Sequence, residues 1–211
     1  MTTHIIWDWN GTLFHDIDAV VGATNVIFQP YQLDPLTPDT FRATYTRPIW
    51  VAYENFLGRP LREGEWEQLD RGYHENYHEL MKQCDLDVGA LAALRAWQAA
   101  GGSQSLLSMW WHERLVPTVH DFAIDTYFDR VDGLRGAGGG PKAEHMAAHL
   151  QALGLDPHDV LVIGDSVDDA DAARDVGARA VVYTGGMSSR AALEATGAVV
   201  VDTLSDALGY A

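Results

Sequence analysis

The stretch Ile5-Ile6-Trp7-Asp8-Trp9-Asn10-Gly11-Thr12-Leu13 decides the fold of this chain. Its first three residues are apolar at both alternating positions, which is typical of a strand buried on both faces of a parallel sheet. The polar residues that follow, with a glycine at position 11, indicate a tight turn. The stretch therefore predicts a buried first strand whose carboxyl end carries the carboxylate of Asp8.

Short apolar runs recur along the chain, each followed by turn residues or a helix start. They cover residues 105–107, 160–163, 180–183 and 199–201. Helical patterns occupy 141–153, 168–176 and 189–196, and residues 204–208 add a last helical turn. Alternating strands and helices predict an α/β fold, a doubly wound parallel sheet with right-handed crossovers. Such sheets bind ligands at the carboxyl ends of their strands.

Residues 16–86 break this alternation, because they hold no convincing strand and are predicted to form consecutive helices. The start and stop signals are Thr37-Pro38-Asp39, Arg47-Pro48 and Gly58, followed by an amphipathic pattern over 65–81. A helix at 88–100 then returns the chain to the sheet, and the glycines at 136–140 indicate a loop. We therefore expect an α/β core of residues 1–15 and 87–211 and an inserted all-helical domain of residues 16–86.

Composition excludes several classes of partner. The chain has 211 residues, 30 of them acidic and 14 basic, for a formal net charge of −16, so a nucleic-acid backbone is repelled over most of the surface. No run approaches the roughly 18 apolar residues of a membrane span. The N-terminal residues lack the pattern of a secretory signal, and the lone Cys84 fits a reducing compartment, so we expect a cytoplasmic protein.

Two of four candidate sites follow the first two predicted strands of the core. Asp8 projects from its turn into the crevice, where a carboxylate can attack phosphorus or hold a metal. Ser108 follows the run 105–107. Its hydroxyl and the adjacent backbone amides, including that of Met109, can bind phosphoryl oxygens.

The other two sites lie in the second half of the chain. Lys142 starts a helix after the glycine-rich loop and is one of only two lysines, the other being Lys82. A point cation there can neutralise a nucleophilic carboxylate and a phosphoryl group together. Asp165 and Asp169 follow the run 160–163 at i and i+4 spacing, which suits a hard cation that prefers oxygen ligands.

In this order, the four sites resemble the four motifs of the haloacid dehalogenase superfamily of hydrolases. The resemblance covers the whole chain, including Ala172-Ala173 and Gly177. The insertion is similar to the helical C1-type cap of phosphoglycolate-phosphatase-like members. The resemblance implies a Rossmann-like core and a phosphatase that acts on a small phosphorylated metabolite, with both monomer and homodimer left open.

The resemblance also implies roles for the site residues. Asp8 would attack the phosphoryl group and form an aspartyl phosphate that water then hydrolyses. Mg²⁺ would be held by the Asp8 carboxylate, the backbone carbonyl of Asn10 and Asp165. Asp169 would orient Lys142 or a water on the metal.

Asn10 departs from the superfamily pattern, which usually has a second aspartate at this position to act as general acid and base. An amide cannot donate and recover a proton, and such catalysis typically contributes ~10²–10⁴-fold to the rate. His15, where the insertion begins, is a candidate substitute acid. Asn10-Gly11 is also a dipeptide prone to deamidation, which would create the missing aspartate.

Asn10 leaves other reactions open. Phosphonoacetaldehyde hydrolases resemble this motif, but they use a cap lysine, for which only Lys82 is available. Haloacid dehalogenases also lack the second aspartate, although they do not need the pair of Asp165 and Asp169. A catalytically weak protein that binds a phosphate ligand is the remaining alternative.

The insertion contains a possible zinc motif and a candidate substrate-binding arginine. The segment His74-Glu75-Asn76-Tyr77-His78 fits the HExxH pattern of zinc peptidases, but no third ligand is evident, so the polar face of a helix explains it better. Arg47 lies near the interruption at Pro48, and an acidic protein that binds an acidic ligand needs local cations. We therefore consider Arg47 a candidate substrate contact.

Overall fold

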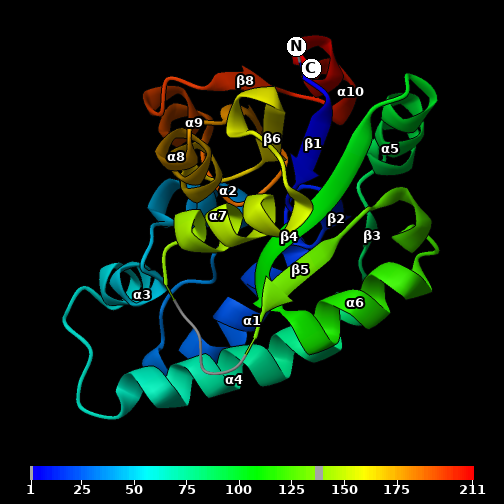
Figure 1. The fold of residues 1–211 in the computed structure, drawn as a ribbon. Helices are drawn as coiled ribbons and strands as arrows, with labels where there is room; N and C mark the ends of the chain where they lie inside the picture. Colours follow the sequence, from blue (N-terminus) through cyan, green and yellow to red (C-terminus); the bar gives the residue numbers. More distant parts are fainter. Residues whose placement is uncertain (1, 136–139) are drawn as a thin grey trace. The chain divides into compact units, whose positions relative to one another are not determined.

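The structure is a computed structural model that describes residues 2–135 and 140–211 (Figure 1). The predicted loop at 136–140 lies outside the described residues, except for Gly140. The chain forms two compact units. The sheet unit comprises Met1–His15, Leu86–Gly186 and Arg190–Ala211, and the helical unit comprises Asp16–Asp85 and Met187–Ser189.

The sheet unit is built on a parallel sheet. Within the described residues its six strands are β1 (His4–Trp7), β4 (Ser103–Trp111), β5 (Val131–Leu134), β6 (Val160–Gly164), β7 (Arg179–Tyr183) and β8 (Val199–Val201). They lie in the order β5-β4-β1-β6-β7-β8, and every pair of neighbours is parallel. The predicted doubly wound parallel α/β fold is confirmed. It places β1, and so Asp8, between β4 and β6.

Helices connect the strands of this unit. They are α5 (Ala90–Ala99), α6 (His112–Asp121), α7 (Lys142–Leu153), α8 (Val167–Val176), α9 (Arg190–Ala195) and α10 (Leu204–Ala207). The helix predicted at 168–176 begins one residue earlier because Ser166 caps it: the Ser166 hydroxyl accepts from the backbone N–H of Asp169. Gly177 ends it with φ of 86°, a conformation that glycine adopts without strain.

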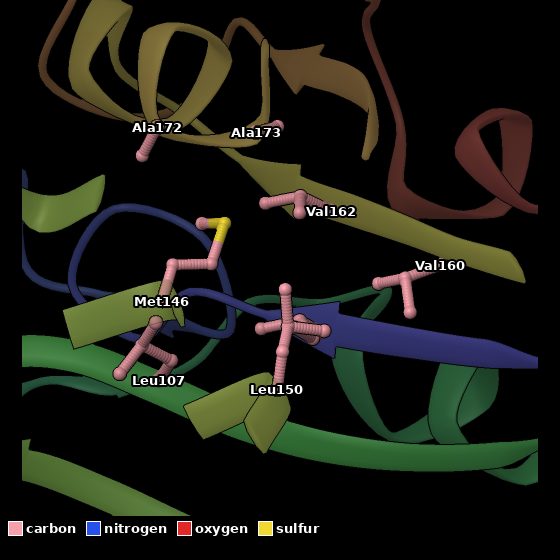
Figure 2. Close-up of a cluster of buried hydrophobic side chains, with 8 residues drawn as sticks. Leu107, Met146, Leu150, Val160, Val162, Ala172 and Ala173 are labelled. Atoms are coloured by element: carbon pink, nitrogen blue, oxygen red, sulfur yellow. The ribbon is translucent and has the colours of Figure 1, made fainter. Parts of the chain in front are cut away.

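The side chains of β1 alternate between two covered faces, which explains why the strand is apolar at both positions. Ile6 belongs to a buried cluster with Met146 and Leu150 of α7. Figure 2 shows this cluster, which also contains Leu107, Val160, Val162, Ala172 and Ala173. On the opposite face, Trp7 donates its indole N–H to the side-chain oxygen of Gln104 at 2.9 Å. The Gln104 amide in turn donates to a carbonyl of α5.

Three predictions about the sheet unit were incomplete. The second strand, predicted at 105–107, extends over Ser103–Trp111, so Ser108 lies within β4 and not after it. The pairing of β4 with β5 becomes irregular between Leu107 and Trp111, which is where Ser108 lies. Strand β5 was missed because its four residues are only half-buried and include Asp132 and Gly133. Helix α6 was also missed, and it contains Pro117.

The helical unit contains α1 (Ile17–Phe28), α2 (Pro38–Thr44), α3 (Ile49–Leu57) and α4 (Glu65–Leu80). Consecutive helices were predicted over 16–86, and the named signals fall at α2, α3 and α4: Thr37 caps α2, Gly58 ends α3 with φ of 64°, and the pattern over 65–81 matches α4. The buried centre of the unit includes Phe28, Tyr53 and Leu69. The two-residue strands β2 (Phe14–His15) and β3 (Asp85–Leu86) lie where the chain leaves and rejoins the sheet unit.

No helix in the described parts of the chain is both long enough and apolar enough to cross a membrane.

Candidate active site

Asp8 lies at the carboxyl end of β1, where the backbone turns sharply. Its backbone N–H donates to the carbonyl of Ile163 at 2.9 Å, which extends the pairing of β1 with β6 by one residue. Gly11 follows with φ of +76°, and a Cβ at this position would lie 2.5 Å from a carboxylate oxygen of Asp165. Only glycine satisfies both conditions. The turn therefore holds Asp8 buried beside the end of β6.

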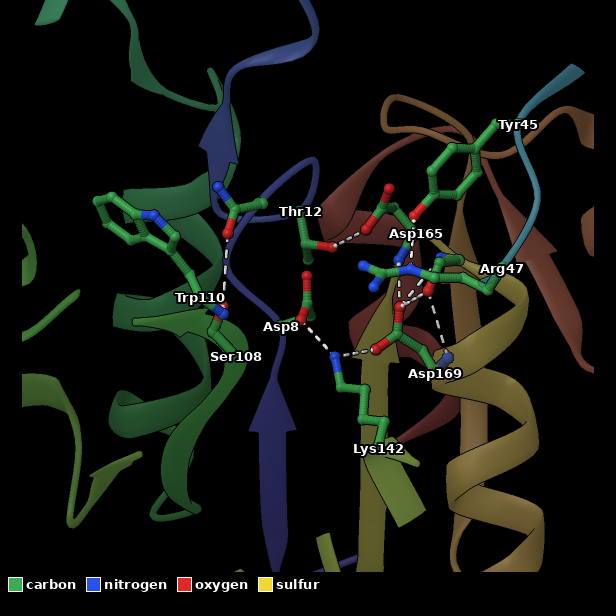
Figure 3. Close-up of polar contacts among 11 residues, drawn as sticks. Asp8, Thr12, Tyr45, Arg47, Ser108, Trp110, Lys142, Asp165 and Asp169 are labelled. Carbon is green, nitrogen blue, oxygen red and sulfur yellow. Dashed lines mark hydrogen bonds and ion pairs between the residues drawn. The ribbon is translucent and has the colours of Figure 1, made fainter. Parts of the chain in front are cut away.

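Lys142 joins two carboxylates. Its ammonium nitrogen donates to a carboxylate oxygen of Asp8 in a very short contact and lies 2.5 Å from Oδ1 of Asp169 (Figure 3). The Lys142 side chain is only 6% exposed. Pro141 caps α7, so Lys142 is the first residue of the helix. The predicted placement of Lys142 beside Asp8 is observed.

Asp169 is held from both sides. Its Oδ2 accepts hydrogen bonds from the backbone N–H groups of Asp165 and Ser166 and from the Ser166 hydroxyl at 2.6 Å. Its Oδ1 pairs with Lys142. These bonds fix Asp169 at the first turn of α8, where the helix dipole also favours a negative charge. Asp169 is therefore placed to orient Lys142.

Asp165 completes a cluster of three buried carboxylates. Carboxylate oxygens of Asp8, Asp165 and Asp169 lie within 4.8 Å of one another. The hydroxyl of Thr12 donates to Oδ1 of Asp165 at 3.2 Å. Oxygen donors of this kind fit a hard divalent cation. Among the described residues, this cluster forms the single group of three or more side chains able to hold a metal ion.

Burial and neighbouring charges shift the pKa values of Asp8 and Lys142 and leave the site with a net negative charge. Burial raises the pKa of Asp8 to about 7, and Asp169 adds to this effect while Lys142 opposes it. Burial disfavours the ammonium, yet Asp169 and Asp8 together raise the pKa of Lys142 above its ordinary value. If all groups are ionised, three carboxylates against one ammonium leave an excess of two negative charges. A bound divalent cation would offset this excess.

Ser108 and Asn10 form a second contact near the turn. The Ser108 hydroxyl lies 3.4 Å from the side-chain oxygen of Asn10, to which it can donate, and it accepts from the backbone N–H of Trp110 at 3.0 Å. The Ser108 side chain is buried, and Met109 is half-buried. The structure therefore brings Ser108 to the turn that carries Asp8, as the sequence predicts.

The sequence also predicts His15 and Arg47 as substrate contacts. His15 is exposed at the end of β2, and among the described residues no hydrogen bond or ion pair is found between His15 and Asp8. Arg47 belongs to the helical unit, where its Nε donates to the hydroxyl of Tyr45 at 3.0 Å. The contacts of His15 and Arg47 with a substrate stay predictions.

Lys82 and His74, the other candidates in the helical unit, are exposed side chains that pair with nearby carboxylates. Lys82 is 55% exposed and pairs with Glu79 at 2.7 Å, which is unlike the desolvated setting that activates a Schiff-base lysine. His74 is exposed and lies 3.5 Å from Asp70. Neither His74 nor His78 joins a group of three potential metal ligands within the described parts of the chain.

Sequence reasoning missed the contributions of Thr12 and Ser166. Thr12 lies in the turn after Asp8, but its bond to Asp165 joins residues 153 positions apart, and no local pattern predicts it. Ser166 had a local signal. A serine followed three residues later by an acidic residue before an apolar run indicates a helix cap.

The model of the haloacid dehalogenase-like hydrolase family matches residues 5–183. The chain belongs to this family. The match spans both the turn at Asp8 and the strand end at Asp165, so the family resemblance predicted from the four motifs is confirmed. This protein is a hydrolase of that family.

Individual relatives agree with this assignment. A phosphoglycolate phosphatase of Caulobacter vibrioides is 28% identical over 189 residues, which cover 86% of this chain and 79% of the relative. A hydrolase of the haloacid dehalogenase-like family from Streptococcus pneumoniae superposes with a TM-score of 0.84 at 18% identity, over 99% of this chain and 98% of that one. A predicted phosphoglycolate phosphatase from Haemophilus somnus gives 0.80 at 20% identity, over 99% and 97%. At these identities the solved structures show the shared fold alone.

Proposed function

We propose that this hydrolase is a Mg²⁺-dependent phosphatase that acts on a small phosphorylated metabolite through an aspartyl phosphate on Asp8. The observation that carries the proposal is the buried cluster of Asp8, Asp165 and Asp169 around the single ammonium of Lys142. The Caulobacter relative, which is named a phosphoglycolate phosphatase, supports the reaction class. It also makes phosphoglycolate the first metabolite to test.

The carboxylates of Asp8 and Asp165, with the backbone carbonyl of Asn10, are the groups that would hold Mg²⁺. Asp169 is left out of this set because its Oδ1 pairs with Lys142 and its Oδ2 accepts three hydrogen bonds. When bound, Mg²⁺ supplies positive charge that lets an anionic phosphoryl group approach an anionic nucleophile.

Two side chains would bind the phosphoryl group. Lys142 stays charged between Asp8 and Asp169, so its ammonium can attract a phosphoryl oxygen while it holds the Asp8 carboxylate in place. The Ser108 hydroxyl, with the backbone N–H of Met109, supplies hydrogen bonds to the other oxygens. The Asp8 carboxylate oxygen that does not bond Lys142 can then attack phosphorus, and the bond from phosphorus to the leaving oxygen breaks.

Proton transfer to the leaving group is the weak step of this mechanism. The amide of Asn10 cannot carry a proton, and its side-chain oxygen faces the Ser108 hydroxyl. His15 stays the candidate acid, because an imidazole can both donate and accept a proton and its side chain is exposed. We therefore expect substrates with good leaving groups to react fastest.

We further propose that residues 16–86 act as a cap on a core formed by residues 1–15 and 87–211. The insertion of consecutive helices between the first two motifs supports this reading. Arg47 would contact the distal part of the substrate, and an Arg47→Ala variant is then expected to raise KM more than it lowers kcat.

The test is Mg²⁺-dependent release of phosphate from an aryl phosphate, whose leaving group needs little protonation. Wild-type protein should release phosphate, a chelator should stop the release, and Asp8→Asn should abolish it. Asp121→Asn, which changes an exposed aspartate at the end of α6, is the matched control. Absence of release from both the wild type and Asn10→Asp rejects the phosphatase and favours the rival reading, a weak binder of phosphate ligands in which Asn10 marks lost turnover.

A further inference from the structure

A chain of buried polar side chains lies in the sheet unit and takes no part in the chemistry proposed above. His149 Nδ1 lies 2.7 Å from a carboxylate oxygen of Asp132, and His149 Nε2 lies 2.8 Å from the hydroxyl of Ser105. The same hydroxyl lies 2.8 Å from Nε2 of His4, whose Nδ1 lies 2.7 Å from the hydroxyl of Ser103. We call Asp132, His149, Ser105 and His4 the polar chain.

The order Asp132, His149, Ser105 matches the connectivity of a hydrolytic triad, but burial excludes that role. Ser105 is 0% exposed, and His149 and His4 are each 1% exposed. Both ring nitrogens of each histidine and the Ser105 hydroxyl are already engaged, all within the polar chain except for the contact of His4 Nδ1 with Ser103. No substrate can reach Ser105, so another role must explain why so many polar groups are buried in a sheet.

The proton positions in the polar chain follow from its charged end. Burial alone would raise the pKa of Asp132, but hydrogen bonds from His149 and Arg130 lower it to about 2. Asp132 is then an anion that only accepts, so His149 Nδ1 must donate to it. The Nδ1–H tautomer of His149 lets its Nε2 accept from the Ser105 hydroxyl. His4 Nε2 then donates to Ser105, which leaves His4 Nδ1 to accept from the Ser103 hydroxyl, for whose single hydrogen the carbonyl of Thr3 at 3.1 Å competes.

The polar chain joins the elements that carry the active site. His149 follows Lys142 by seven residues on α7, and seven residues turn a helix to within about 20° of two full turns. The two side chains therefore share a face of α7. Ser105 precedes Ser108 on β4, and His4 is the first residue of β1, which Asp8 directly follows. The same hydrogen bonds thus link the supports of three site residues.

Hydrogen bonds fix the position of α7 along its axis, which the apolar packing of this helix does not do by itself. Met146 and Leu150 attach α7 to the sheet through apolar contacts, which tolerate small shifts along the helix axis. The bonds of His149 to Asp132 on β5 and to Ser105 on β4 fix the helix at two points on two strands. A shift of about 1 Å at a catalytic group can cost ~10²-fold in rate, and the Lys142 ammonium contacts both Asp8 and Asp169.

We propose that His149, held by Asp132 and Ser105, is a positioning residue that fixes α7 against β4 and β5 and so places Lys142 between Asp8 and Asp169. The catalytic readout of this inference rests on the proposed phosphatase function. The placement of Lys142 is independent of that function and is measured separately.

The first measurement is the NMR signal of the lysine ammonium groups. The chain has only two lysines, Lys82 and Lys142, and Lys82 is 55% exposed while Lys142 is 6% exposed. Lys142 should give a slowly exchanging ammonium signal in the wild type. His149→Leu should broaden or remove it and leave the Lys82 signal unchanged. His145→Leu, on the same helix but outside the polar chain, is the matched control and should preserve both signals.

The second measurement is hydrolysis of an aryl phosphate by the same variants. His149→Leu should lower kcat about 10- to 100-fold with KM within about twofold, and His149→Asn should recover part of the loss, because its amide nitrogen replaces the Nδ1–H that bonds Asp132. If His149→Leu does not fold, as circular dichroism would show, His149→Asn and Ser105→Ala replace it, and each should weaken the Lys142 signal.

The outcomes separate the two proposals. Unchanged Lys142 signal or unchanged kcat in a folded, active His149 variant overturns the positioning role, even if its melting temperature falls. A wild-type protein without hydrolysis refutes the phosphatase proposal, and the ammonium signal then decides by itself whether His149 positions Lys142.

Discussion

The backbone N–H of Gly11 donates a hydrogen bond of 2.9 Å to the carbonyl of Phe14. This nitrogen is the atom that must attack the Asn10 side chain for deamidation to occur. The turn therefore engages the reactive nitrogen of a dipeptide that would be labile in an unfolded chain. Attack would also require Gly11 to change its backbone conformation. Its φ is +76°, and the Asp165 side chain packs closely against it.

Deamidation at Asn10 should consequently be slow in the folded protein. Peptide mapping of native protein after prolonged incubation at neutral pH should show an unmodified Asn10. The same incubation in denaturant should produce a mass increase of one unit at this residue. Equal rates of Asn10 deamidation in the two conditions would contradict this account of the turn. Deamidation in the native state would also supply the missing aspartate.

Restoring the aspartate directly should accelerate turnover. In Asn10→Asp the new carboxyl group can protonate the leaving oxygen and then activate water, so kcat for an alkyl phosphate should rise by ~10²-fold or more. The gain should be smaller for an aryl phosphate, whose leaving group needs less protonation. Steady-state rates for the two substrates check this, and Asn10→Ser, which adds no titratable group, is the control.

Divalent metal should stabilise the folded protein through the carboxylate cluster. At a Mg²⁺ concentration 100 times its Kd, the gain is about 2.7 kcal/mol, which corresponds to roughly 5–10 °C in Tm for a chain of this size. Asp165→Asn should remove most of this shift, whereas Asp175→Asn, at an exposed position of α8, should preserve it. Equal shifts in both variants would place the metal elsewhere.

Stability should fall on mild acidification because of His4. Burial lowers the pKa of His4 to about 4, with Asp129 opposing and His149 reinforcing the effect, so between pH 6.5 and 4 the unfolded chain binds a proton that the folded chain does not. The stabilisation is complete above pH 6.5 and is lost as the pH falls through about 4.

The measurement for His4 is the free energy of unfolding in urea at several values of pH from 7 to 4. His4→Gln, which keeps one donor toward Ser105, should show a decline smaller than that of the wild type by about 1–3 kcal/mol. Parallel curves for the two proteins would show that His4 does not titrate in this window.

Much of this fold could be predicted because its signals are local. Residues 5–7 and 160–163 are apolar on both faces, and Thr37 and Gly58 are helix boundaries with a clear physical cause. Strand β5 gave no such signal. It is short and half-buried, and the polar Asp132 breaks its apolar pattern. Asp132 bonds His149, which lies 17 positions away in the sequence.

The residues of the candidate site also divide into those with a local sequence signal and those without one. Asp8, Asp165 and Asp169 were predicted because they follow strands whose carboxyl ends meet at one edge of the sheet. The bond from Thr12 to Asp165 and the polar chain beneath Lys142 depend on tertiary geometry. Sequence spacing alone could not predict them, because each joins elements that are distant in the chain.

The central claim is that Asp8 is the nucleophile, and trapping its covalent intermediate tests it most directly. Because Asn10 cannot activate water, the aspartyl phosphate should accumulate when an aryl phosphate reacts with Mg²⁺-loaded protein. Mass spectrometry after acid quenching should find one phosphoryl group on the peptide that contains Asp8, less of it in Asn10→Asp, and none in Asp8→Asn. Phosphate release without any phosphoryl group on this peptide, or its persistence in Asp8→Asn, would contradict the account.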